Sequence, residues 1–125
     1  MKSIEKNSDS TTTIHQMRER AKTFSHERDW DQFHSPKEMV INLVRESTEL
    51  LELFLWQNDQ EIAQRIKDDP KFRQDIADEL GDVVHSIVQF ANLMEGCDVS
   101  KAFFDKMDKT EKKYPAATFR GKRSN

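Results

Sequence analysis

The stretch SPKEMVINLVRESTELLELFLW, residues 35–56, decides the fold class. Ser35 can cap a helix, Pro36 fits the first helical position, and Glu38 can complete a capping box. When successive residues are turned by about 100°, the apolar side chains share one broad face, as in an amphipathic helix. We therefore predict a helix from Pro36 to about Gln57. Its apolar face consists of Met39, Leu43, Val44, Leu50, Leu51, Phe54 and Leu55.

A second stretch of the same kind begins at Pro70, with Asp69 in the capping position. The predicted helix runs to about Glu95, and Gly96 then suits a left-handed C-cap. We expect the apolar faces of the two helices to pack together as the core. The second face consists of Ile76, Leu80, Val83, Val84, Ile87, Val88, Phe90 and Ala91.

The flanking segments also favour helices. Ile14, Met17, Ala21 and Phe24 form a helical stripe within residues 11–27, and residues 28–34 follow as an aromatic-rich loop. Residues 59–67 suit a short helix or an ordered connector, and a last helix is expected from about 98–100 to the residue before Pro115. Sustained period-two alternation is absent. We therefore predict an all-α, four-helix-bundle-like domain over 11–115, with a disordered tail at 1–10 and a polar, mobile tail at 116–125.

Composition excludes several classes of protein. The length of 125 residues suits one domain, and the 34 % of charged residues indicate a soluble chain with a heavily charged surface. Apolar runs stay well short of the roughly 20 residues that span a membrane, and residues 1–13 lack the apolar core of a signal peptide, so we expect a cytoplasmic protein without a membrane partner. The net charge of −3 argues against binding of a nucleic acid polymer. Cys97 is the single cysteine, so neither an internal disulfide nor a cysteine zinc site is expected.

Two pairs of acidic residues border the apolar faces. Glu46 and Glu49 are three residues apart, as are Glu79 and Asp82, so each pair occupies adjacent turns on one side of its helix. If the apolar faces pack together, both pairs can face one groove. Two carboxylates at about 4 Å repel each other by on the order of 4 kcal/mol at intermediate dielectric, so four of them need a cation or protons.

Ligands that are all carboxylate oxygens favour hard cations such as Mg²⁺, Mn²⁺ or Ca²⁺. Mg²⁺ commonly binds few carboxylates together with substrate phosphates, which points to phosphoanhydride chemistry. Acids three residues apart recur elsewhere in the chain, for example Asp75 and Asp78, and most such pairs lie on solvated helix faces. The alternative interpretation is therefore a helical interaction module with a solvated acidic stripe. A di-iron bundle needs two Glu-x-x-His pairs, which the four histidines do not supply.

Several motifs resemble one family. Glu46-Ser-Thr-Glu49 followed by Glu79-Leu-Gly-Asp82 is similar to the ExxE…ExxD signature of the MazG-like all-α nucleotide pyrophosphohydrolases. Three further stretches resemble the dCTP pyrophosphatase branch of that family. They are ERDWDQFHSP (27–36), ELLELFLW (49–56) and KMDKTEKKYP (106–115), and the resemblance extends over about residues 17–121.

The resemblance implies a MazG-type helical fold in which two protomers combine to form the sites, as a homodimer or a dimer of dimers. It implies Mg²⁺-dependent cleavage of a nucleoside triphosphate to the monophosphate and pyrophosphate, with Mn²⁺ as a substitute ion. It also implies dCTP or a modified dNTP as substrate and a role in nucleotide-pool housekeeping. Glu46, Glu49, Glu79 and Asp82 occupy the metal-ligand positions. Glu49 and Glu52 are the candidates to activate water, and Glu52 is alternatively an ordinary surface residue.

The same resemblance assigns substrate contacts. Trp30 and Trp56 match aromatic positions near the base, although either suits a core or dimer interface, and His34 is either a base contact or a loop residue. Lys106 and Lys113, two turns apart, suit phosphate contacts or a solvated helix end, and Tyr114 follows them. These six residues form the predicted substrate-binding set.

The chain departs from the family pattern at three positions. Thr110 replaces the usual Asn, which affects one polar substrate contact. His85 and Ser86 stand where the dCTP branch tends to be apolar or aromatic, so the base preference is open, and we interpret His85 as a neighbour of the metal ligands. Related pyrophosphatases that act on dUTP or damaged nucleotides are the alternative within the enzyme class.

Overall fold

The computed structural model describes residues 7–123, and this part of the chain contains helices and no strand. The predicted all-α class is therefore confirmed. The helices are α1 (Ile14–Glu27), the 3₁₀ turn η2 (Asp31–Phe33), α2 (Pro36–Glu52), α3 (Asp59–Asp68), α4 (Pro70–Ala91), α5 (Val99–Lys113) and α6 (Ala116–Phe119).

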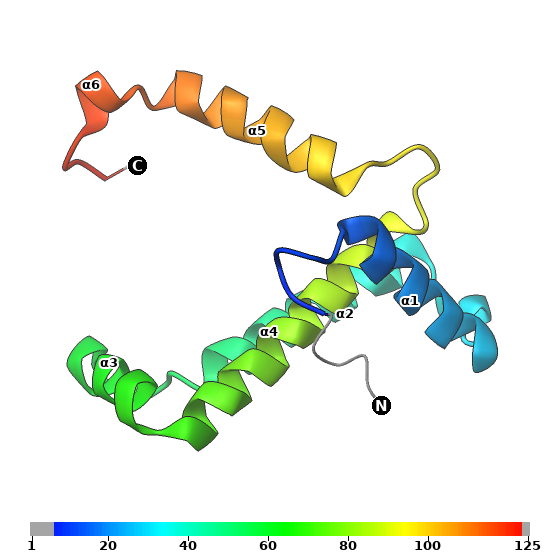
Figure 1. Cartoon of the computed structure of the whole chain (residues 1–125), viewed down its shortest axis with the longest axis horizontal. Coiled ribbons are helices and arrows are strands. Elements are labelled where there is room, and N and C mark those ends of the chain that lie inside the picture. The colour runs from blue at the N-terminus through cyan, green and yellow to red at the C-terminus, as the bar shows by residue number, and fades with distance from the viewer. Residues whose placement is uncertain (1–6, 124–125) are drawn as a thin grey trace. The chain divides into compact units, whose positions relative to one another are not determined.

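The chain forms two compact units, one up to Met94 and one from Glu95. In the first unit, α2 packs along α4, α1 lies against α4, and α3 contacts α4 near its beginning (Figure 1). The second unit contains α5 and α6, and the ring of Tyr114 meets that of Phe119 edge to face at 5.1 Å. The boundary after Met94 falls inside residues 11–115, whose assignment as one domain stays a prediction.

Hydrogen bonds confirm the two predicted helix starts, although the Glu38 side chain does not complete the capping box expected at Ser35. Ser35 Oγ accepts from the Glu38 amide at 3.2 Å, and Asp69 Oδ1 accepts from the Phe72 amide at 3.1 Å. Pro36 and Pro70 both stand in the first turn of their helices, where a missing N–H costs little. Residues 59–68, left open between helix and connector, form α3 behind an Asn58 capping box.

Both long helices end earlier than predicted. The helix expected to reach Gln57 ends at Glu52, because the last turn tightens and Trp56 adopts a left-handed backbone with φ of 67°. The helix expected to reach Glu95 ends at Ala91. There the Arg18 guanidinium donates to the Ala91 carbonyl at 2.9 Å and to Asn92 Oδ1 at 3.1 Å, which holds this end of α4 against α1. Gly96 has the expected positive φ, of 78°, but lies beyond the helix end.

The ends of the chain differ from the predicted tails where the structure describes them. Residues 1–6 of the expected disordered tail lie outside the described part, whereas the Ser8 carbonyl accepts from the amides of Thr11 and Thr12. The predicted polar tail after Pro115 contains the one-turn helix α6.

The core is smaller than the predicted apolar faces. Met39, Phe72, Val88, Ala21 and Ala91 are buried between the helices of the first unit. Other members of the same faces are on the surface: Val44 is 61 % exposed, Leu51 57 % and Leu80 52 %. The expectation that these faces are wholly buried is therefore wrong for a single chain, because α1 and α3 do not cover them. None of the described helices is long and apolar enough to span a membrane.

Candidate active site

Two adjacent helices bring four carboxylates together. Glu46 and Glu49 come from α2, Glu79 and Asp82 come from α4, and one oxygen of each lies within 4.8 Å of the others. The side-by-side packing of α2 and α4 creates this juxtaposition, as the acid spacing predicted. We call these four residues the acid cluster.

Two oxygens of the acid cluster are buried without a partner. Glu46 Oε2 and Glu79 Oε2 accept no hydrogen bond from the described residues. Burial raises the pKa of Glu46, and Glu49, Asp82 and Glu79 raise it further, while Arg45 opposes them. Burial also raises the pKa of Glu79, again reinforced by Glu49 and Asp82. Buried polar atoms are almost always satisfied in native proteins, so these two oxygens require a proton or a cation.

The donor set fits Mg²⁺. All four groups offer carboxylate oxygen, the ligand that hard cations prefer, and the described cluster includes neither histidine nor cysteine. Asp82 is exposed while the other three acids are partly buried, so the cluster opens to solvent on one side. A bound ion could therefore keep water molecules or substrate oxygens on that side.

A polar contact that the sequence analysis missed lies next to the cluster. Asn42 Nδ2 donates to Ser86 Oγ at 2.9 Å, and Arg45 Nη1 donates to Asn42 Oδ1 at 2.9 Å. Asn42 is one turn before Glu46, and buried Ser86 is one turn after Asp82. The sequence signal for this contact was a polar residue within the apolar face of each helix, Asn42 in α2 and Ser86 in α4. The contact fixes the axial register of α2 and α4 beside the acids.

Glu52 is not part of the acid cluster. It is the last residue of α2 and is exposed. Glu49 is one of the four converging carboxylates and is therefore better placed than Glu52 to act on a metal-bound substrate.

Trp30 lies against α1 in the first unit. Its ring meets that of Phe24 edge to face at 5.6 Å, and Phe24 in turn meets His85 at 5.8 Å. His34 is partly buried. Burial is the main cause that lowers the pKa of His85, and the charges of His34 and Arg20 add to it, so His34 lies in the same region. The structure thus connects one predicted base contact, Trp30, with His85 through the ring of Phe24.

Trp56 requires a correction. A helix that continued to Gln57, as predicted, would place Trp56 two turns beyond Glu49 on the same side, at the border of the acid groove. In the structure α2 has ended at Glu52, and Trp56 sits in the following loop with 98 % of its surface exposed. The helical spacing that linked Trp56 to Glu49 therefore does not apply.

The remaining predicted substrate residues belong to the second unit. Lys106 and Lys113 lie on α5, and Tyr114 caps its end. Lys113 Nζ lies 5.3 Å from the centre of the Tyr114 ring, which gives a cation–π contact.

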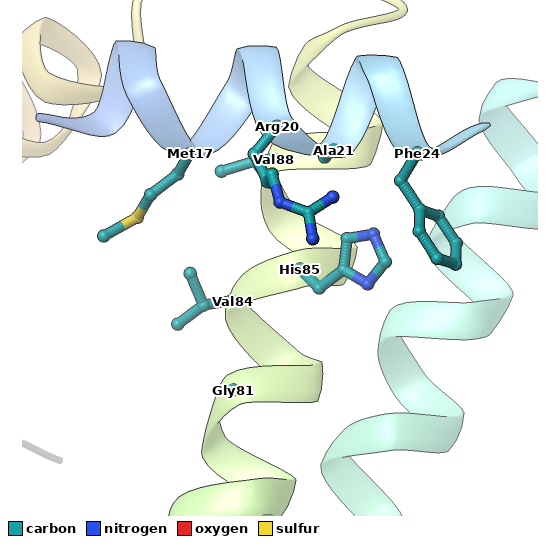
Figure 2. Close-up of a pocket in the computed structure, with 8 residues that line it drawn as sticks. All are labelled: Met17, Arg20, Ala21, Phe24, Gly81, Val84, His85 and Val88. Atoms are coloured by element: carbon teal, nitrogen blue, oxygen red, sulfur yellow. The ribbon is translucent and has the colours of Figure 1, made fainter. Parts of the chain in front are cut away.

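A cavity of about 350 Å³ lies between α1 and α4 (Figure 2). Its lining combines two polar residues, Arg20 and His85, with a mainly apolar wall. This cavity was not expected from the sequence, although the stripe at Met17, Ala21 and Phe24 forms one side of it. The other wall residues are Gly81, Val84 and Val88.

Comparison with known proteins agrees with the fold and the cluster. Residues 34–118 match the MazG nucleotide pyrophosphohydrolase domain, and this match includes all four acids. The chain therefore belongs to the MazG nucleotide pyrophosphohydrolase family, as its motifs predicted. This membership confirms the enzyme class predicted from the sequence, a nucleotide pyrophosphohydrolase.

Individual relatives point to one branch of the family. The chain is 37 % identical over 109 residues to dCTP pyrophosphatase 1 of Rattus norvegicus, covering 87 % of this chain and 63 % of that protein. It is 36 % identical over 104 residues to dCTP pyrophosphatase 1 of Homo sapiens, covering 83 % and 60 %. The chain thus spans about six tenths of the length of these relatives. A solved pyrophosphatase from Archaeoglobus fulgidus superposes with a TM-score of 0.73 at 25 % identity, covering 82 % of this chain and 92 % of that one.

Proposed function

We propose that this protein hydrolyses a nucleoside triphosphate, preferentially dCTP or a modified dNTP, to the monophosphate and pyrophosphate with the help of Mg²⁺. The observation that carries the proposal is the acid cluster, whose Glu46 and Glu79 each leave a buried oxygen without a hydrogen bond. The names of the relatives support cytosine as the base. Mn²⁺ would substitute as a second hard cation.

The acid cluster would hold the ion, and its four carboxylates would compensate the ion's charge. Bound there, Mg²⁺ supplies Lewis-acid stabilisation of the negative charge that develops on the phosphates. In the reaction, a water oxygen forms a bond to the α-phosphorus while the bond from that phosphorus to the bridging oxygen breaks. Pyrophosphate leaves with that oxygen, and the water gives up a proton. Glu49 would accept this proton, with Glu52 as the less well placed alternative.

The substrate contacts extend this proposal. Trp30 and His34 would contact the base beside α1, and Trp56 would do so from its loop. Lys106, Lys113 and Tyr114, on the second unit, would bind the phosphates as point charges and a hydrogen-bond donor.

Trp56, 98 % exposed, and the exposed apolar side chains of α2 and α4 support a site completed by a second copy, in a homodimer or homotetramer. We place the enzyme in the cytoplasm, in nucleotide-pool housekeeping.

The decisive test is pyrophosphate release from a panel of dNTPs and NTPs, measured with Mg²⁺, with Mn²⁺ and with EDTA. We expect release that needs the ion and is fastest for dCTP or a 5-modified dCTP. Faster release from dUTP or a damaged nucleotide would support the proposed reaction but identify a different preferred substrate. Folded protein that releases no pyrophosphate from any nucleotide, and that Mg²⁺ does not stabilise, would instead identify a non-catalytic interaction module.

A further inference from the structure

The cavity between α1 and α4 is close to the acid cluster. Gly81 and His85 line it, and Asp82 lies between them in sequence on the same helix. Along a helix axis His85 is only about 4.5 Å beyond Asp82. The cavity therefore borders the turn of α4 that carries Asp82, although none of the four acids lines it.

The wall of the cavity suits a flat, apolar ring. Phe24 and Val84 contribute apolar surface, and Gly81 leaves open space, with no other atom within 4 Å of the position of a Cβ. A volume of about 350 Å³ falls in the range of small-molecule pockets. Phe24 also meets Trp30 edge to face, so the predicted base contact and the cavity wall are continuous. These features favour a nucleobase over a phosphate as the occupant.

The polar groups of the cavity are Arg20 on α1 and His85 on α4. Their side chains extend from the two helices into the same space (Figure 2), and the positive charge of Arg20 influences the titration of His85. Within residues 7–123, Arg20 has no hydrogen-bond or ion-pair partner, so its N–H groups are available to a ligand. Burial lowers the pKa of His85, against the opposing effect of Asp82, and so favours the neutral imidazole.

We propose that Arg20 and His85 are specificity-determining residues that read the edge of the base within this cavity and select cytosine. The proposal rests on the proposed function, since it assigns the base selectivity of that reaction. Neither residue belongs to the motifs that resemble the family, and His85 is one of the positions where the chain departs from the pattern.

The selection follows from the hydrogen-bonding groups of each partner. Arginine offers only donors, in a planar fork that suits two adjacent acceptors. Cytosine presents two adjacent acceptors, N3 and O2, beside an amino group, and the neutral imidazole of His85 has one acceptor nitrogen for that amino group. Thymine and uracil place an N–H between two carbonyls, and this N–H would face a donor of Arg20. Guanine also presents adjacent acceptors, O6 and N7, and so is the competing base.

Substitutions at the two residues test the proposal in the full-length protein. We expect Arg20→Met to lower the ratio of kcat/KM for dCTP over dTTP about tenfold, mainly through slower dCTP turnover. Arg20→Lys keeps the positive charge but loses the planar pair of N–H donors, so it should also lower the ratio of kcat/KM for dCTP over dTTP. His85→Leu should reduce the ratio for dCTP over dUTP, and His85→Gln, whose amide oxygen accepts a hydrogen bond, should restore part of it.

Matched controls exclude general effects of charge or helix stability. Arg73→Met on α4 and His15→Leu on α1 lie outside the cavity lining and should keep the wild-type ratio. If Arg20 only attracts phosphates, Arg20→Lys would keep full activity and Arg20→Met would slow all nucleotides equally. That result, or a wild-type preference for dATP, dGTP, dTTP or dUTP over dCTP, would overturn the proposal.

A binding measurement separates this inference from the hydrolysis. Deoxycytidine carries no phosphate and needs no metal, so in EDTA it should shift the NMR signals of Ala21 and Gly81, whereas thymidine should shift them less. These shifts should disappear in Arg20→Met. Shifts without any hydrolysis would support the cavity while rejecting the proposed reaction. Hydrolysis of dCTP without such shifts, and with unchanged ratios in the variants, would reject the cavity alone.

Discussion

Ser86 Oγ accepts a hydrogen bond from Asn42 Nδ2 at 2.9 Å, and this contact ties α4 to α2 one turn from both acid pairs. Ser86 is only 2 % exposed, so its partner cannot be replaced by water without rearrangement. The four carboxylates must converge for a cation to bind, and convergence depends on the register of the two helices. The register contact and the metal affinity should therefore be coupled.

The first prediction concerns this contact. Ser86→Ala should lower the free energy of unfolding by about 1–2 kcal/mol, because it leaves the Asn42 amide without its partner. It should also weaken Mg²⁺ binding several-fold. Urea denaturation and Mg²⁺ titration would measure the two effects. Ser47→Ala, on the exposed side of α2, is the control and should change neither. Unchanged Mg²⁺ affinity in Ser86→Ala would show that register does not depend on this bond.

The second prediction separates the two candidate bases. Glu49→Gln should abolish pyrophosphate release while the helical circular dichroism stays unchanged, because the substitution removes charge but little volume. Glu52→Gln should retain activity within about twofold, since Glu52 is exposed and outside the acid cluster. Pyrophosphate release and Mg²⁺ binding would be measured for both. The opposite pattern, with Glu52→Gln inactive but still binding Mg²⁺, would move the base to Glu52.

The sequence was sufficient for the fold class and for the acid cluster because both depend on local patterns. Ser35, Pro36, Asp69 and Pro70 define helix starts through hydrogen bonds and dihedral angles within one turn. Acids three residues apart share one helix side whatever the tertiary structure, and only the packing of α2 on α4 had to be added.

What the sequence could not specify depends on longer-range contacts. The end of α4 is fixed by Arg18, more than seventy residues away in the chain. Trp56 leaves the helix through a left-handed backbone, which is uncommon for a residue with a large side chain. The cavity needs α1 to lie across α4, so no stretch of the sequence alone encodes it. Periodicity predicts which residues share the apolar face of α2 or α4, but it does not show how much of that face the other helices of the chain cover.

The third prediction concerns the pH dependence of the metal-free protein. Folding raises the pKa of Glu46 and Glu79 above the usual 4.5. For such groups, stability is fully present below pH 4.5 and is lost as the pH rises through the folded-state pKa. Without metal, Glu46→Gln should therefore match the wild type at pH 4 and have a higher Tm at pH 7.

Saturating Mg²⁺ should reverse this order at pH 7, because only the wild type has the full set of ligands. Thermal unfolding at several pH values, with and without Mg²⁺, would measure both effects. Asp78→Asn, which lies next to Glu79 but outside the cluster, is the control and should respond normally to Mg²⁺. A metal-free Glu46→Gln protein that is less stable than the wild type at pH 7 would contradict the proposed charge repulsion.

The fourth prediction tests whether a second copy covers the exposed apolar face. Val44 is 61 % exposed in the single chain, so Val44→Glu should leave the fold of one chain intact but place a charge in any interface between α2 helices. We expect the wild type to be a dimer or tetramer in analytical ultracentrifugation and Val44→Glu to dissociate and lose pyrophosphate release. Ile66→Glu, an equally apolar exposed position on α3, should keep both assembly and activity. A wild-type monomer with full activity would show that one chain forms the complete site, and Val44, Leu51 and Leu80 would then need another explanation.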